Sequence, residues 1–321
     1  MAFILSIYLV LHLCIGLVLP RRQGFKPYFF RLMENIGLEL ERRLNRTTRS
    51  QSIRFMRGTI IAAILGLIGV LIGGLVQDAA RLPYGWAAIF IFLSLCINFM
   101  TPLKLVRYII GALNNNELQK ATEAVRPYLK ESLEKADAYT VIRKTIEFIA
   151  LSLNQFLLAP AFWFLIAGPL GLSIYVTFAA LQQAFGLPDE QRRYFGSFVR
   201  LVDMLLNIIP AFLTAVLLSI SALFVSKSNP LQALAVIFQA ARRYYIPYPY
   251  WPVAALAGGL GVTLGGPILY DSGYTEERPW IGPAGSSARL SSADLSRAIL
   301  LQYVFFAMLL GMVSGIIILK I

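Results

Sequence analysis

The sequence predicts an all-α polytopic membrane protein, a transmembrane helical bundle of about seven spans, with six to eight as the range. Hydrophobic residues make up 57% of the 321 residues and charged residues 14%, whereas soluble domains average about 45–50% and about 25%. Uncharged stretches of roughly 20 residues recur along the chain, and that length crosses the hydrocarbon core of a bilayer. These two observations exclude a soluble globule, a disordered chain and a disulfide scaffold.

The first three predicted spans are the uncharged runs at residues 2–19, 58–76 and 85–103. The run 2–19 has no basic region before it and is interpreted as an anchor rather than a cleaved signal peptide. The short polar link 77–84 joins the other two runs and predicts a helical hairpin. Glycines at positions 66, 69, 73 and 74 favour close packing of the second span against another helix.

The second half of the chain predicts four further spans, less regularly spaced. Residues 148–187 are uncharged, and Gly168-Pro169 breaks them near the middle, which indicates two spans or one span with a re-entrant piece. Residues 204–226 and 299–319 predict two more spans. The intervening range 227–298 is rich in glycine and aromatic residues and is interpreted as a re-entrant or loop segment, because 253–269 is too broken to predict a helix. We expect one membrane domain, 1–321.

The net charge of +12 is concentrated beside the apolar runs. Residues 21–57 and 104–147 are basic, which predicts that both face the cytoplasm and that 77–84 is external. This pattern predicts a multi-pass protein of the bacterial inner membrane, with the lipid bilayer as partner and no nucleic acid. Within the second segment, residues 118–133 predict an amphipathic helix bent near Pro127. It either packs beneath the bundle or binds a protein partner.

Several kinds of chemistry have no sequence signal. Two cysteines and one histidine form no zinc, disulfide or metal pattern, and neither a phosphate-binding P-loop nor a GxGxxG motif occurs. The spans also lack the chain of acidic and basic residues expected of an ion-coupled transporter, which makes a transporter the third function considered.

Polar side chains inside the apolar runs predict a cavity, because lipid cannot satisfy their hydrogen bonds. We expect its lining to include Asn154, Gln155, Gln182, Gln183 and Asn207.

Short motifs along the chain resemble the CobD/CbiB membrane proteins of cobalamin biosynthesis and the related AmpE-type membrane proteins. The similarity runs in order from about residue 20 to the end, and its C-terminal motifs are the most specific. The stretches that carry it are ERRLNR at 41–46, LAPAFW at 158–163, FG at 195–196, LTA at 213–215, WPVAALAG at 251–258, LGGPILY at 264–270 and RPWIG at 278–282.

The resemblance implies adenosylcobinamide-phosphate synthesis, in which ATP and magnesium drive the joining of an amino-alcohol phosphate to a corrin carboxylate. Position by position, however, the family's acids in this comparison are replaced by Leu151, Gln155 and Gln182. The residues that could remain from a ligand pocket are Glu147, Asn154, Gln155, Gln182, Gln183, Asp203, Asn207, Arg242, Arg243 and Tyr270.

The missing acids favour a divergent, non-catalytic family member with a sensing or regulatory role, no cofactor, and a small-molecule, cell-wall or corrinoid ligand. On this interpretation it does not replace a cobinamide-phosphate synthase. The alternative is the synthase itself, using ATP and magnesium at a rearranged site.

Overall fold

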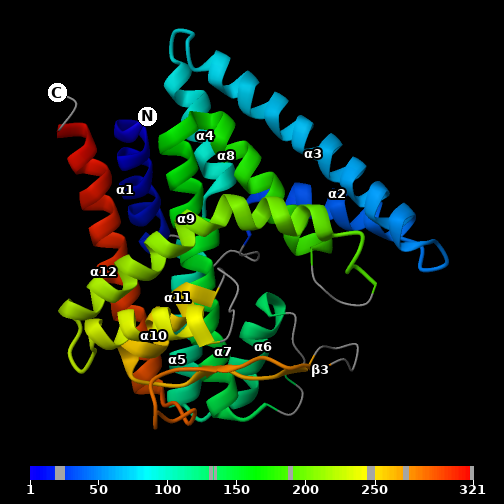
Figure 1. Ribbon diagram of the computed structural model, residues 1–321. Coiled ribbons are helices and arrows are strands. Elements are labelled where there is room, and N and C mark those ends of the chain that lie inside the picture. Colours follow the sequence, from blue (N-terminus) through cyan, green and yellow to red (C-terminus); the bar gives the residue numbers. More distant parts are fainter. Residues whose placement is uncertain are drawn as a thin grey trace.

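The computed structural model describes residues 1–18, 26–129, 133, 136–186, 191–243, 250–269 and 275–318. Helices dominate the described residues (Figure 1). The α-helices are α1 (Ala2–Val18), α2 (Tyr28–Leu44), α3 (Gln51–Ala79), α4 (Gly85–Cys96), α5 (Met100–Asn114), α6 (Leu118–Val125), α7 (Ala138–Leu153), α8 (Ala159–Phe185), α9 (Ser197–Ser221), α10 (Pro230–Arg243), α11 (Trp251–Leu260) and α12 (Ser292–Ile318). Short 3₁₀ turns, η1 (Arg126–Tyr128) and η3 (Ala222–Phe224), follow α6 and α9.

Four helical segments of the described chain are long and apolar enough to cross a membrane, so the expected count of about seven is not confirmed. They are α3, the continuous run from α7 to α8, α9 with η3, and α12. Shorter apolar helices of 10 to 17 described residues occur in α1, α4 and α11.

The run 85–103 is one uncharged stretch in the sequence but two helices in the structure. Helix α4 ends at Cys96, Ile97 is extended (φ −118°, ψ 129°), and α5 begins at Met100. Pro102 lies in the first turn of α5, where its missing N–H costs nothing, but it cannot continue a helix from Asn98. The break therefore has a local cause.

The predicted break at Gly168-Pro169 is present as a kink rather than as a loop between two helices. Gly168 has φ 64° and ψ −151°, inside an otherwise helical α8. Helix α8 continues beyond the kink to Phe185, so the whole range 138–185 forms one bent helical segment.

Helix α3 crosses one side of the molecule and packs on α8 (Figure 1). Glycines form part of the contact surface: Gly66 lies against Phe178, Gly69 against Thr177, and Gly73 against Leu170. The Ser173 hydroxyl donates a hydrogen bond of 2.7 Å to the Gly69 carbonyl oxygen. Helix α8 is thus the helix against which these glycines pack closely, as the sequence predicts.

Residues 227–298 contain more regular structure than the sequence indicates. Helix α11 is buried along its full length, although no helix was expected there. Two antiparallel strand pairs follow, β1 (Leu264–Gly265) with β4 (Trp280–Ile281), and β2 (Ile268–Leu269) with β3 (Thr275–Glu276). The strands extend across the end of the molecule opposite the N-terminus (Figure 1). These short strands are a small departure from the all-α prediction.

Candidate functional site

A polar cavity of about 190 Å³ lies where the α7–α8 segment meets α9. Polar residues make up most of its wall. The lining residues are Leu151, Asn154, Gln155, Gln182, Gln183, Asp203, Asn207 and Tyr250. We call this space the amide cavity.

A π-helical turn, η2 (Asn154–Leu158), separates α7 from α8 and carries two of these residues. Such a turn adds one residue to the helical repeat, and it occurs frequently at functional sites. Asn154 is 6% exposed and points into the protein although the surrounding sequence is apolar. Burial of its amide is tolerated because every polar atom of that side chain has a partner.

Hydrogen bonds connect the floor of the amide cavity across three helical segments. Asn154 Nδ2 donates to Asn207 Oδ1 at 3.1 Å. The Thr214 hydroxyl donates to Asn154 Oδ1 at 3.0 Å, and Asn207 Nδ2 donates to Asp203 Oδ1 at 2.9 Å. Tyr175 adds a hydroxyl donor to Asn207 Oδ1 at 3.2 Å. The network fixes the Asp203 carboxylate, which is only 5% exposed as a residue.

Three glutamines also line the amide cavity. Gln183 Nε2 donates a long hydrogen bond of 3.4 Å to Gln155 Oε1. Gln182 Oε1 is buried and has no hydrogen-bond partner among the residues that the structure describes. A buried carbonyl oxygen without a donor is costly, and this one lies against Gly186, where an added Cβ would collide with it.

A second cavity of about 150 Å³ adjoins the first and shares Leu151, Gln155, Gln183 and Tyr250 with it. Charged residues are added here: Lys26, Glu147 and Arg278 also line it. The Arg278 guanidinium lies 5.1 Å from the ring centroid of Tyr250 and also donates a hydrogen bond to the Tyr250 hydroxyl. We call this space the charged cavity.

The C-terminal strands bring Arg278 to the charged cavity. Glu147 Oε1 accepts a hydrogen bond of 2.8 Å from the Gly265 N–H. Gly265 is paired with Trp280 in the β1–β4 ladder, and the Gly266 N–H donates to the Pro279 carbonyl oxygen at 3.2 Å. Glu147 therefore tethers to α7 the strand pair that carries Arg278.

The sequence-predicted residues separate into two groups. Asn154, Gln155, Gln182, Gln183, Asp203 and Asn207 line the amide cavity, and Glu147 lines the charged one. Arg242 is exposed at the end of α10 and is not among the lining residues of either cavity. The side chain of Arg243 and the whole of Tyr270 lie outside the described part of the chain.

The lining residues that were absent from the predicted set include Lys26, Tyr250 and Arg278. Arg278 opens the RPWIG motif, and that motif was the available signal for it. Lys26 lies in a basic segment, and the expected cytoplasmic position of that segment accounts for its charge without any role in a cavity. Neither position indicates a cavity until the strands and α2 are placed.

The cavities contain few ligands for a metal ion. Asp203 is the one carboxylate among the amide-cavity residues, and Glu147 is engaged by Gly265 and by Lys144 Nζ at 3.3 Å. The described residues hold no group of three His, Cys, Asp or Glu side chains that could bind a metal. They do not build a site for magnesium by themselves, since Mg²⁺ prefers several hard oxygen ligands.

Comparison with protein families decides the relationship. The model of the family described as "CobD/Cbib protein" matches residues 9–302. The chain belongs to the CobD/CbiB family. No solved structure matches it.

Curated members of the CobD/CbiB family are 27–30% identical to this chain over the aligned residues. The cobalamin biosynthesis protein CobD of Rhodobacter capsulatus is 30% identical over 254 residues, covering 78% of this chain and 77% of its own. That of Brucella suis is 30% identical over 209 residues, covering 65% of this chain, and the match spans 63% of the Brucella protein. That of Listeria monocytogenes is 27% identical over 262 residues, covering 81% and 82%.

Membership of the CobD/CbiB family, together with the apolar helices, indicates a multi-pass membrane protein. The comparisons support the CobD/CbiB part of the resemblance and give no support to its AmpE-type part or to a regulatory role. The structure also shows where three positions of the family motifs lie. Leu151, Gln155 and Gln182, which replace the family's acids in the motif comparison, all line the amide cavity.

Proposed function

We propose that this protein acts in cobalamin biosynthesis in the bacterial inner membrane, binding a corrinoid precursor at the amide cavity and carrying out the family's amide ligation. One observation carries the proposal. Family-motif positions 151, 155 and 182, separated along the chain, converge with Asp203 on a single cavity. Convergence of this kind is expected of a substrate site, and it is not required by packing alone.

The chemistry of the wall suits a corrinoid side arm. Corrinoids carry short arms that end in amides or carboxyl groups, and amide side chains both donate and accept hydrogen bonds. The amide cavity offers five such side chains and the unpaired Gln182 Oε1. At about 190 Å³ it has room for an arm and not for the macrocycle, so the ring would lie outside the mouth of the cavity.

The charged cavity supplies the complementary charges for the second substrate. Arg278 and Lys26 are cations on its wall, and guanidinium and ammonium groups are the usual side-chain partners of phosphate. An amino-alcohol phosphate bound there would lie beside a corrin arm, because the two cavities share a wall. The described residues that line the two cavities do not by themselves form a magnesium site.

A second function, binding without turnover, has one specific observation in its favour. Leu151, Gln155 and Gln182 leave the amide cavity with Asp203 as its one carboxylate, and stabilisation of developing charge depends on such groups. A sensing role would use the same pocket and the same ligand. The names of the relatives favour the biosynthetic role at least as well.

Complementation distinguishes the two functions. The full chain is produced in a strain lacking its own cobinamide-phosphate synthase, and cobamide is quantified in cells whose membranes contain comparable amounts of the protein. We expect the wild type to restore cobamide synthesis, Asp203→Asn to lower it at least tenfold, and Glu39→Gln, on the exposed face of α2, to have no effect. Failure of the wild type, with the protein present in the membrane, would leave the non-catalytic role.

A further inference from the structure

The turn between α2 and α3 carries a dense positive charge at one outer edge of the molecule (Figure 1). Six arginines lie between residues 42 and 57, and no acidic residue occurs from 42 to 77. The Arg42 and Arg43 side chains are 76% and 72% exposed, and Arg46 is exposed as well. Glu39 pairs with Arg42 and Arg43, so a single acid faces several cations.

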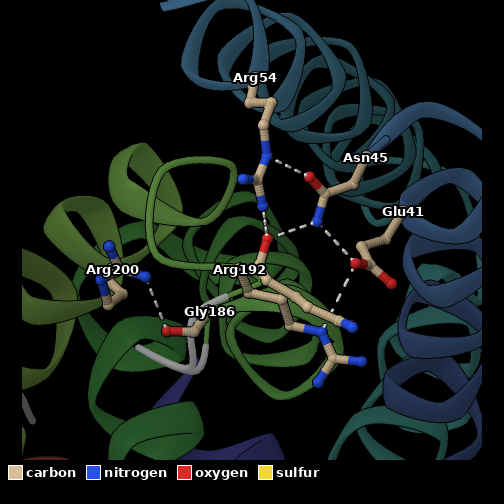
Figure 2. A network of polar contacts seen from close by, with 7 residues as sticks. Glu41, Asn45, Arg54, Gly186, Arg192 and Arg200 are labelled. Atoms are coloured by element: carbon tan, nitrogen blue, oxygen red, sulfur yellow. Dashed lines mark hydrogen bonds and ion pairs between the residues drawn. The ribbon is translucent and has the colours of Figure 1, made fainter. Parts of the chain in front are cut away.

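A network of partly buried polar contacts connects this turn to residues 191 and 192 (Figure 2). Arg54, which is 7% exposed, donates from Nε to Asn45 Oδ1 at 2.9 Å. Asn45 Nδ2 donates to Glu41 Oε1 at 2.8 Å and to the Gln191 carbonyl oxygen at 2.9 Å. Arg54 also donates to that carbonyl oxygen, and Arg192 pairs with Glu41 at 3.6 Å. Glu41 and Arg54 thus make their contacts within this network, and the exposed arginines Arg42, Arg43 and Arg46 are not part of it.

The length of α3 places the turn at the level of the lipid headgroups. Helix α3 has 29 residues and is thus about 43 Å long, whereas the hydrocarbon core is about 30 Å thick. The uncharged stretch 58–76 matches the core, so residues 51–57 lie beyond it. Apolar side chains are exposed there beside the arginines: Ile53, Phe55 and Met56 are 41%, 46% and 54% exposed. Apolar groups next to cations suit the boundary between acyl chains and headgroups.

We propose that this turn is a binding surface for an anionic phospholipid, with Arg42, Arg43 and Arg46 contacting the headgroup phosphate and Ile53, Phe55 and Met56 contacting the first acyl carbons. Guanidinium groups suit phosphate because their N–H groups form paired hydrogen bonds with its oxygens. The proposal is independent of the proposed function, since it involves neither cavity.

The test uses the full chain reconstituted in phosphatidylcholine vesicles, with trace spin-labelled phosphatidylglycerol or phosphatidylcholine. The fraction of each label that is immobilised by the protein gives its relative association. We expect the wild type to favour phosphatidylglycerol about fivefold, which corresponds to the interaction of about one surface cation with an anionic lipid. Arg42→Gln/Arg43→Gln/Arg46→Gln should lower this preference to near one, whereas the corresponding triple lysine variant should keep most of it.

Lys120→Gln/Arg126→Gln/Arg289→Gln, which removes three exposed charges elsewhere, is the matched control and should leave the preference unchanged. Millimolar inorganic phosphate should not compete, which distinguishes a lipid site from a free-phosphate site. Absence of the preference in the wild type, its full retention in the triple glutamine variant, or its loss with phosphate would each overturn the proposal.

Discussion

Glu147 and Gly265 are 118 residues apart and are joined by a hydrogen bond of 2.8 Å from the Gly265 N–H to Glu147 Oε1. The other carboxylate oxygen of Glu147 pairs with Lys144, whose side chain is only 2% exposed. One glutamate thus compensates a buried cation and ties β1, with its partner strand, to α7. The sequence-based interpretation placed Glu147 in a ligand pocket; the contacts also give it a tethering role.

The first prediction concerns this buried ion pair. Glu147→Gln should lower the free energy of unfolding by about 3–5 kcal/mol, because it breaks a buried ion pair by removing one of its charges. Lys144→Met/Glu147→Gln should recover most of the loss, since both charges are then absent. Thermal unfolding in detergent measures the difference. Equal losses in the single and the double variant would mean that the pair contributes nothing specific.

A second prediction concerns the packing of α3 on α8. A Cβ atom at Gly73 would lie 2.8 Å from Leu170 Cα and 3.0 Å from the Pro169 carbonyl oxygen, whereas one at Gly74 meets nothing within 4 Å. Gly73→Ala should therefore destabilise the protein by about 1–3 kcal/mol. Gly74→Ala, the matched control, should be neutral or slightly stabilising because alanine is the better helix former. Similar unfolding temperatures for both variants would contradict the packing.

A third prediction concerns pH and the start of α7. Asp137 accepts a hydrogen bond of 2.8 Å from the Thr140 N–H, and hydrogen bonds from Thr140 hold the pKa of Asp137 below its ordinary value of 3.8. The carboxylate therefore stabilises the fold above pH 3.8, and this contribution is lost as the pH falls through the lower folded-state pKa.

Asp137→Ala should cost about 1 kcal/mol at neutral pH, and the difference from the wild type should shrink below about pH 4. Asp137→Asn keeps a capping oxygen that does not titrate, so its stability relative to Asp137→Ala should change little with pH. A wild-type advantage over the alanine variant that stays constant from pH 7 to pH 3 would disprove the role of the cap.

The polar character of the amide cavity was predictable from local sequence, because each of its polar side chains would cost free energy if it faced lipid. An amide such as Asn154 inside an apolar helix must face protein or water wherever the helix lies. Gly168-Pro169 was recognisable for a similar reason, since glycine permits the positive φ and proline interrupts the helical hydrogen bonds.

Other features depend on contacts between distant residues and were not predictable. Arg278 reaches the charged cavity only because β4 pairs with β1 and Glu147 holds β1. The π-helical turn at Asn154 was not predictable either, because the residues that form it also occur in ordinary α-helices. Four helical segments of the described residues are long enough to cross a membrane, so the predicted count of about seven is not confirmed, because an apolar run indicates burial in protein as well as in lipid.

The most direct test of the account is the binding of cobinamide to the purified full-length protein, measured by quenching of its tryptophan fluorescence. We expect saturable binding, weakened about tenfold by Gln182→Leu, because that variant removes an amide side chain from the cavity wall and loss of a hydrogen bond to a buried polar group costs about 1–3 kcal/mol. Gln239→Leu on the exposed face of α10 is the control and should bind as the wild type does. If the wild type shows no saturable binding, or Gln182→Leu binds equally tightly, the amide cavity is not the corrinoid site.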